Sequence, residues 1–354
     1  MSDKDNLIVN AATRLFQDLS TTAAINEAET GRWPAELWNA LEESGLPLAW
    51  VPDDLGGAGA EIGDGFAVMQ VAGSFAAPVP LAETLLAGYV LAQAGMGAPQ
   101  GPMTVAPVTP DTRIELGRDG RLTGVARQVP FARLAEHIAV LADAGGETRV
   151  ALVRTADCAI NAGVSYAGEP RDDVRFDGVA PEAVAPAGPG FDAEGLIALG
   201  AAARCSQMAG ALQRILDQSV QYATERVQFG KPISKFQVIQ HGLAELAGEA
   251  AAAGAAAGMA AEAISRGTGL DDRALSDIAA AKVRVGEAAT TGSAIAHQVH
   301  GAMGFTYEHS LHHSTRRLWS WRDDFGNEAY WSIRLGRLLA KQGADELWPF
   351  ITAA

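Results

Sequence analysis

The sequence predicts an α+β protein that is mostly helical and is built of three consecutive parts. Residues 1–100 have the apolar spacing of helices, residues 101–190 form short β-rich runs between turn residues, and residues 191–354 return to long helices. A chain of 354 residues is also too long to pack around one small core, so two or three packed units are expected. We therefore expect an N-terminal helical domain, a middle antiparallel β domain and a C-terminal four-helix bundle.

The N-terminal part contains several helical patterns. Trp33-Pro34 precedes apolar residues at steps of three and four, and Gly45 ends this pattern. A turn-rich segment, residues 51–57, separates it from helices expected at 64–73 and 81–94.

The residue pattern changes in the middle part, where Gly, Pro and Asp separate short apolar runs. Strands are expected at Val105–Val108, Thr112–Leu116, Ala135–Leu141, Val150–Arg154 and Val174–Phe176. In the last part an apolar stripe at helical spacing runs from Met208 to Val227. Further long helices are expected over 236–266, 272–303 and 323–342.

Composition excludes several classes of protein. Apolar residues make up 48% of the chain, and 27 basic against 42 acidic side chains leave a net charge of −15. This balance argues against nucleic acid and against an anionic membrane surface. Two cysteines, Cys158 and Cys205, form no disulfide framework or zinc site, and the acidic N-terminus does not resemble a signal peptide. A cytoplasmic protein without membrane spans is predicted, since the Ala/Gly-rich run 250–261 reads as a bundle helix.

The segment from Arg226 to Gln237, RVQFGKPISKFQ, carries the most chemistry. It breaks two long helical patterns. The guanidinium of Arg226 can clamp a phosphate pair, Phe229 offers a flat apolar face for an adenine, and Gln237 offers both a donor and an acceptor.

A second segment, Gln298 to Glu308 (QVHGAMGFTYE), is spaced by glycines. Gly301 and Gly304 let backbone amides approach a phosphate or sugar closely, and Gln298 can bond a ribose or adenine edge. Alone, such a stretch most often marks a helix break. The pair of segments is the stronger signal.

Together these two segments resemble the acyl-CoA dehydrogenase family, flavoenzymes that desaturate acyl thioesters, and the order helix, β, helix is similar as well. The resemblance implies FAD as cofactor, bound across a dimer interface in a site housed mainly by the neighbouring subunit. Ala302 stands where the family has the second Gly of a pair. The contacts that the family assigns to the pyrophosphate and adenosine fall on Arg226, Gln228, Phe229, Gln237, Gln298, Gly301 and Ala302.

The family also needs a carboxylate that takes the α-proton of the thioester while hydride leaves Cβ for the flavin. One family position falls on Phe325 and the other on Gly200, so neither carries a carboxylate. Glu194 and Asp324 are secondary candidates for a relocated base; otherwise no catalytic residue is predicted. The favoured interpretation of Asp323 and Asp324 is that they are solvated charges or partners of Arg316, Arg317 and Arg322. The flavin-covering Thr-Glu-Pro loop is also missing before Gln128-Val129-Pro130.

Five histidines lie close together in the sequence, at positions 297, 300, 309, 312 and 313. They suggest a metal site, but they straddle a glycine-rich break and lack a fixed carboxylate or thiolate pattern. Polar, interface or ligand-edge roles are favoured, with His300 nearest to a ligand. Trp319, Trp321 and Trp331 are expected in the core or at a subunit interface.

The resemblance implies a base-lacking subunit of a heterotetrameric acyl-CoA dehydrogenase. The partner would supply the carboxylate, the substrate would be an acyl-CoA of fatty-acid or bulky steroid side-chain β-oxidation, and an electron-transfer flavoprotein or oxygen would accept electrons. One alternative is a self-sufficient homo-oligomeric dehydrogenase with Glu194 or Asp324 as base. Another is a non-catalytic structural or regulatory paralogue.

Overall fold

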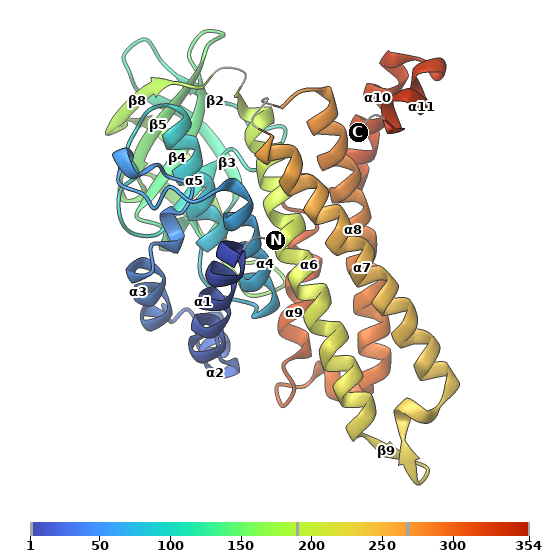
Figure 1. Cartoon of the computed structure of the whole chain (residues 1–354). Helices are drawn as coiled ribbons and strands as arrows, with labels where there is room; N and C mark the ends of the chain where they lie inside the picture. The colour runs from blue at the N-terminus through green and yellow to red at the C-terminus, as the bar shows by residue number, and fades with distance from the viewer. Residues whose placement is uncertain (1–2, 189–190, 267–269, 353–354) are drawn as a thin grey trace.

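The computed structural model describes residues 3–188, 191–266 and 270–352. Short N-terminal helices and a twisted sheet occupy one side of the molecule, and long helices of the C-terminal part occupy the other (Figure 1). This arrangement confirms the predicted mostly helical α+β class. The domain limits at 100 and 190 stay predictions, and residues 189–190 lie outside the described part of the chain.

The N-terminal part is helical. Its apolar pattern after Trp33-Pro34 forms a helix whose Leu37, Trp38 and Leu41 are buried, as the spacing predicts. The helices are α1 (Asp3–Leu19), α2 (Thr22–Glu29), α3 (Ala35–Glu43), α4 (Ile62–Ser74) and α5 (Leu81–Gln93). Helix α4 packs tightly on the first long helix of the C-terminal part, because a Cβ added at Gly73 would lie 2.0 Å from the Gln207 carbonyl oxygen.

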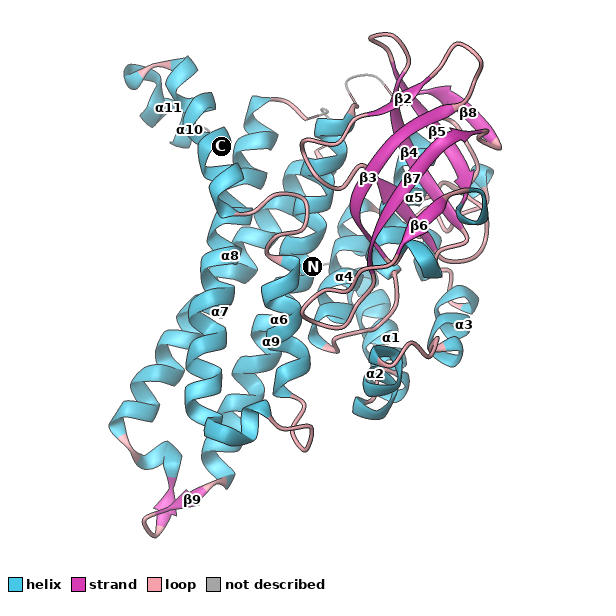
Figure 2. Ribbon diagram, turned by 180° about the vertical axis from the view of Figure 1, so that it is seen from behind, coloured by secondary structure: helices cyan, strands magenta, loops and turns pink. Residues whose placement is uncertain are grey.

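The middle part is one sheet with strand order β6-β7-β3-β2-β4-β5-β8, and β1 pairs with β4 (Figure 2). The expected antiparallel pairing holds for most neighbours, but β1 and β2 pair with β4 in parallel. The strands are β1 (Met103–Ala106), β2 (Ile114–Leu116), β3 (Leu122–Pro130), β4 (His137–Asp143), β5 (Thr148–Arg154), β6 (Ala159–Asn161), β7 (Arg171–Val179) and β8 (Ala183–Pro186).

The long helices of the C-terminal part pack side by side in both views (Figures 1 and 2). They are α6 (Ala193–Glu225), α7 (Gln237–Ser265), α8 (Asp272–His300), α9 (Leu311–Trp321) and α10 (Glu328–Gln342), followed by the short α11 (Leu347–Thr352). The stripe on α6 buries Met208, Leu212 and Ile215, whereas Val220 is 42% exposed. None of the helices among the described residues is long and apolar enough to cross a membrane.

The expected helix over 323–342 begins later than predicted, at Glu328. Phe325 and Gly326 have φ angles of 55° and 91°, so the chain turns here instead of continuing the helix. Asn327 then caps α10, because its side chain accepts a hydrogen bond from the backbone N–H of Tyr330. Phe325, in this turn, has a buried side chain.

Candidate functional site

The Arg226–Gln237 segment forms a hairpin at the far end of the bundle (Figure 1). Strands β9 (Val227–Gln228) and β10 (Lys231–Pro232) pair in antiparallel fashion. Phe229 and Gly230 both have positive φ, which suits a tight two-residue turn. The turn presents the Phe229 ring to solvent, 92% exposed, with only an edge contact to Phe236.

The other predicted contacts of this segment also face outward. Arg226, Gln228 and Gln237 are exposed, and no carboxylate in the described ranges forms an ion pair with the Arg226 guanidinium. An exposed guanidinium and an exposed aromatic ring can hold a phosphate and a stacked base.

The second predicted segment lies at the same end of the bundle. Gln298, Gly301 and Ala302 are exposed, and Gly301 has a φ of 58°. A small apolar cluster joins it to the hairpin, since Val299 of α8 packs with Ile233 just after β10. The structure thus brings the two segments together at one edge of the molecule.

The two positions expected for a base meet in the core. A Cβ added at Gly200 on α6 would lie 2.2 Å from Cδ1 of Phe325. The Phe325 ring, 1% exposed, fills the space beside Gly200. Both positions therefore belong to one locus, and an apolar ring occupies it.

A buried ionic network surrounds this ring. Nη2 of Arg204 lies 2.5 Å from a Glu83 carboxylate oxygen, and its Nε lies 2.8 Å from Oδ2 of Asp324. The Arg204 guanidinium stands 5.7 Å from the centroid of the Phe325 ring. Nη2 of Arg171 reaches the same Asp324 oxygen at 2.8 Å. Two guanidinium groups thus share one carboxylate.

The network continues into the other parts of the chain. Glu169 pairs with Arg171 at 3.3 Å and with Arg317 at 3.0 Å, and it accepts a hydrogen bond from the Trp321 indole N–H. Its members come from α5, α6, β7, α9, the end of the β6–β7 connection and the turn before α10. Sequence reasoning missed this network; the one signal was a charged residue, Arg204, inside the mostly apolar helical run 196–212.

The ionic network determines the protonation state of the Asp324 carboxyl. Burial alone would raise the pKa of this carboxyl, but the neighbouring Arg171 and Arg204 outweigh burial and hold the pKa below its ordinary value. The sequence suggested that Asp324 is solvated or pairs with Arg316, Arg317 or Arg322. That suggestion was wrong.

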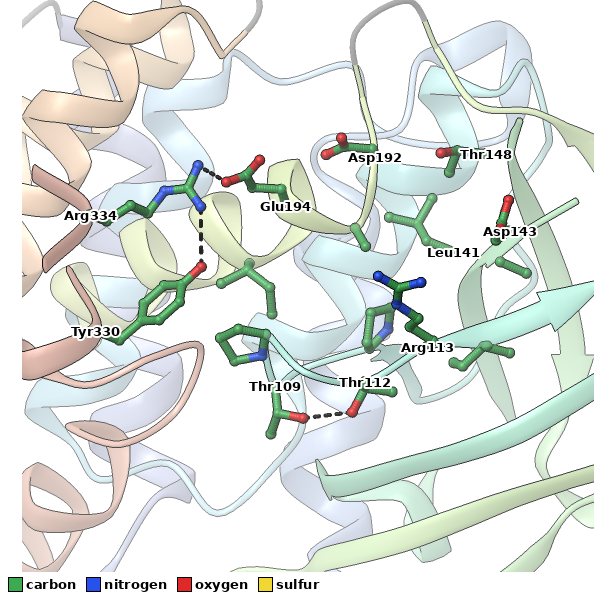
Figure 3. A pocket seen from close by; sticks show the side chains of 16 residues that line it. Thr109, Thr112, Arg113, Leu141, Asp143, Thr148, Asp192, Glu194, Tyr330 and Arg334 are labelled. Carbon is green, nitrogen blue, oxygen red and sulfur yellow. Dashed lines mark hydrogen bonds and ion pairs between the residues drawn. The ribbon is translucent and has the colours of Figure 1, made fainter. Parts of the chain in front are cut away.

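Glu194, the other secondary candidate, lies in the first turn of α6 at the edge of a cleft of about 410 Å³. Figure 3 shows its carboxylate paired with Arg334, whose Nη1 donates to the Tyr330 hydroxyl at 3.3 Å. The opposite wall comes from the β1–β2 connection and includes Arg113 (Figure 3). Six residues of helix rise about 9 Å, so Glu194 is remote from Gly200.

Four of the five histidines and two of the three tryptophans are buried. In the described ranges, no group of three or more His, Cys, Asp or Glu is arranged to hold a metal ion. Trp321 and Trp331 are core residues. Gln128-Val129-Pro130, which stands where the resemblance would place flavin-covering residues, is the end of β3, where a bulge lies and Gln128 has a φ of 55°.

Comparisons with known proteins agree with these observations. The family model of the acyl-CoA dehydrogenase C-terminal domain matches residues 192–322. Acyl-CoA dehydrogenase IpdE2 of Mycobacterium tuberculosis is 30% identical over 277 residues, which cover 78% of each chain. The chain belongs to the acyl-CoA dehydrogenase family.

Solved structures of similar fold include members of two-component complexes. A chain of the ChsE4-ChsE5 complex from Mycobacterium tuberculosis superimposes with a TM-score of 0.86, at 24% identity and over 97% of this chain and 99% of that one. A chain of the Tcur3481-Tcur3483 steroid ACAD, a G363A variant, gives 0.85, at 23% identity and over 96% and 98%. Among acyl-CoA dehydrogenases, the chain therefore shares its fold with subunits of such assemblies.

Proposed function

We propose that this chain is a base-lacking subunit of an FAD-dependent acyl-CoA dehydrogenase. The observation that carries the proposal is the core locus where both expected base positions meet, which Phe325 fills against Gly200. The segments that would contact FAD are, in contrast, exposed at the edge of the molecule. Such a chain would complete a flavin site that its partner houses, and the partner would supply the carboxylate.

The exposed residues fit the pyrophosphate–adenosine part of FAD. Arg226 would pair with the pyrophosphate, and Phe229 would stack on the adenine. The amides of Gln228, Gln237 and Gln298 would bond the ribose or adenine, while Gly301 and Ala302 would offer backbone N–H groups. When bound, FAD would accept the hydride that leaves Cβ of the acyl thioester.

Neither secondary candidate is well placed to act as a base on the substrate. Asp324 is ionised between two arginines, so it holds a proton poorly at neutral pH. Glu194 is paired with Arg334 and lies outside the core locus. Both placements favour a base on another chain.

The substrate that we propose is an acyl-CoA with a bulky or steroid-type acyl group. Its support is the fold shared with the Tcur3481-Tcur3483 steroid ACAD and with the ChsE4-ChsE5 complex. A heterotetramer in the cytoplasm, with an electron-transfer flavoprotein as acceptor, completes the proposal.

A self-sufficient enzyme is the second candidate, and the cleft beside Glu194 favours it. Its volume of about 410 Å³ is within the range of small-molecule sites. In that case the lone chain would bind flavin and turn over acyl-CoA.

The deciding experiment compares the purified chain alone with the chain co-expressed with its candidate partner. The visible flavin spectrum and acyl-CoA turnover should appear only in the pair. Arg226→Ala in the pair should lower FAD occupancy, whereas Arg154→Ala, an exposed control on β5, should not. Bound flavin and acyl-CoA turnover in the lone chain would contradict the proposal. Absence of flavin from both preparations would favour a structural paralogue.

A further inference from the structure

The connection between α8 and α9, residues 301–310 and here called the glycine loop, rests on three histidine rings. Each contact joins one aromatic ring of the loop to one histidine outside it. The ring centroids are 4.1 Å apart for Phe305 and His297, 4.6 Å for His309 and His300, and 5.2 Å for Tyr307 and His312. The loop has little other cover, since Phe305 is 65% and Tyr307 71% exposed.

Two of these histidines, His297 and His300, are anchored to the helices behind them. His297 stacks on Trp319 and shares a 2.9 Å hydrogen bond with the Thr315 hydroxyl of α9. His300 stacks on Tyr222 of α6, with ring centroids 4.5 Å apart. Tyr222 accepts the backbone N–H of Arg226 through its carbonyl oxygen, so His300 links the glycine loop to the base of the hairpin.

The hydrogen bonds of His300 identify its neutral form. Its Nδ1 lies 2.8 Å from the Ala296 carbonyl oxygen, which can only accept, so Nδ1 carries the proton. Nε2 is then a lone-pair acceptor in the neutral ring, buried and without a partner in the described part of the chain. Protonation would turn it into a buried N–H donor that has no acceptor, which is unfavourable.

The charges around the rings oppose protonation as well. Burial lowers the pKa of His300 and His312 to about 4 and also lowers the pKa of His297. His300 faces Tyr222, His309 and His297, and Arg214 lies near His309. His312 faces His313 and Arg316, and the one carboxylate among its charged neighbours, Glu29, is bonded to both of these.

We propose that His297, His300 and His312 are positioning residues whose neutral rings hold the glycine loop ready for a dinucleotide, and whose protonation releases it. The proposal rests on the proposed function, in which this loop and Gln298 contact FAD of the assembled enzyme. A loop held by ring contacts keeps the amides of Gly301 and Ala302 in one arrangement. A cationic ring would leave its buried stack, and the loop would move with it.

The test measures FAD dissociation from the co-expressed complex between pH 7.5 and 4, by flavin fluorescence. FAD should bind more weakly as the pH falls through this range. His300→Phe keeps an uncharged ring, so its affinity at pH 7.5 should stay within about threefold of the parent and its pH dependence should be flatter. His300→Ala removes the ring and should weaken binding about tenfold at every pH, equivalent to about 1.4 kcal/mol.

His241→Phe is the matched control, since His241 is exposed on α7 and should leave affinity and pH dependence unchanged. Thermal unfolding of each complex at pH 7.5 separates a misfolded variant from a released loop. An unchanged pH dependence in His300→Phe, or parental affinity in His300→Ala, would overturn the inference. If Arg226→Ala still lowers FAD occupancy in that case, the proposed function stands without this inference; if Arg226→Ala has no effect either, both fail.

Discussion

At the residue scale, Arg204 is the clearest case of a side chain whose partners the sequence does not reveal. It sits within a helical run of small apolar residues and is 1% exposed. Its partners Glu83 and Asp324 are 121 and 120 positions away. Only the folded chain brings them within hydrogen-bond distance, and Gln207, three residues along α6, is its local partner.

Replacing Arg204 by Met should destabilise the chain strongly. The change leaves Glu83 and part of Asp324 buried without their counter-charge, which costs about 3–5 kcal/mol. Urea unfolding at pH 7 measures the loss. Arg154→Met is the matched control, because Arg154 forms exposed pairs with Asp157 and Glu182, and it should cost no more than about 1 kcal/mol. Equal losses in the two variants would contradict the importance of the buried network.

The exposed site residues were easier to place from the sequence. The sequence predicts a break between two long helical patterns here, and in the structure this break is a hairpin with Phe229-Gly230 at its tip. What the sequence cannot supply is the ligand side of the contact. The roles of Arg226 and Phe229 in binding FAD stay predictions for that reason.

At the scale of elements, the sequence predicted long helices well and irregular segments poorly. Helices α7 and α8 end within a few residues of their expected limits. Strand β3 was not predicted as a strand, because its bulge at Gln128 breaks the alternation of apolar and polar residues. The turn at Phe325 was also missed, because the helix expected over 323–342 included it.

The contact between α6 and this turn makes a prediction about packing. Gly200→Ala should cost about 1–3 kcal/mol, because its Cβ would overlap the Phe325 ring. Phe325→Ala should cost about 3–5 kcal/mol by opening a cavity. The double variant should lose clearly less than the sum, because each change relieves the other.

Urea unfolding of the four proteins gives this coupling directly. Gly63→Ala serves as a control for adding a methyl group, since no atom lies within 4 Å of a Cβ at that position on α4. Strict additivity of Gly200→Ala and Phe325→Ala would mean that the two positions do not share one locus. The two family base positions would then not coincide in the core.

At the scale of the whole molecule, the order of helical and β parts could be read along the chain, but their junction could not. The network of Glu83, Arg171, Arg204 and Asp324 joins residues from the N-terminal helices, the sheet and the bundle. Ionic contacts of this kind follow no sequence period, unlike the apolar stripes. Titratable groups outside this network make the stability of the whole chain depend on pH.

Two groups of side chains set that dependence in separate windows. The pKa values of His300 and His312 lie near 4, below the ordinary 6.5, so the unfolded chain binds more protons and stability falls as the pH drops from about 6.5 to 4. Burial opposes ionisation of Glu29, but hydrogen bonds with His313 and Arg316 outweigh it and lower its pKa to about 2. The stability that Glu29 contributes is present above pH 4.5 and is lost as the pH falls towards 2.

Urea unfolding from pH 7.5 down to 3 should therefore show a continuous decline in the free energy of unfolding. His312→Phe should flatten the upper part of the curve, since it removes a group that gains a proton on unfolding. Glu29→Gln should lower stability at pH 7 and flatten the curve below pH 4.5, because its hydrogen bonds no longer depend on ionisation. Parallel curves for all three proteins would show that other groups control the loss of stability in acid. If His312→Phe flattens only the upper part of the curve and Glu29→Gln only the part below pH 4.5, the loss is assigned to the histidines that contact the glycine loop and to Glu29 with its partners His313 and Arg316.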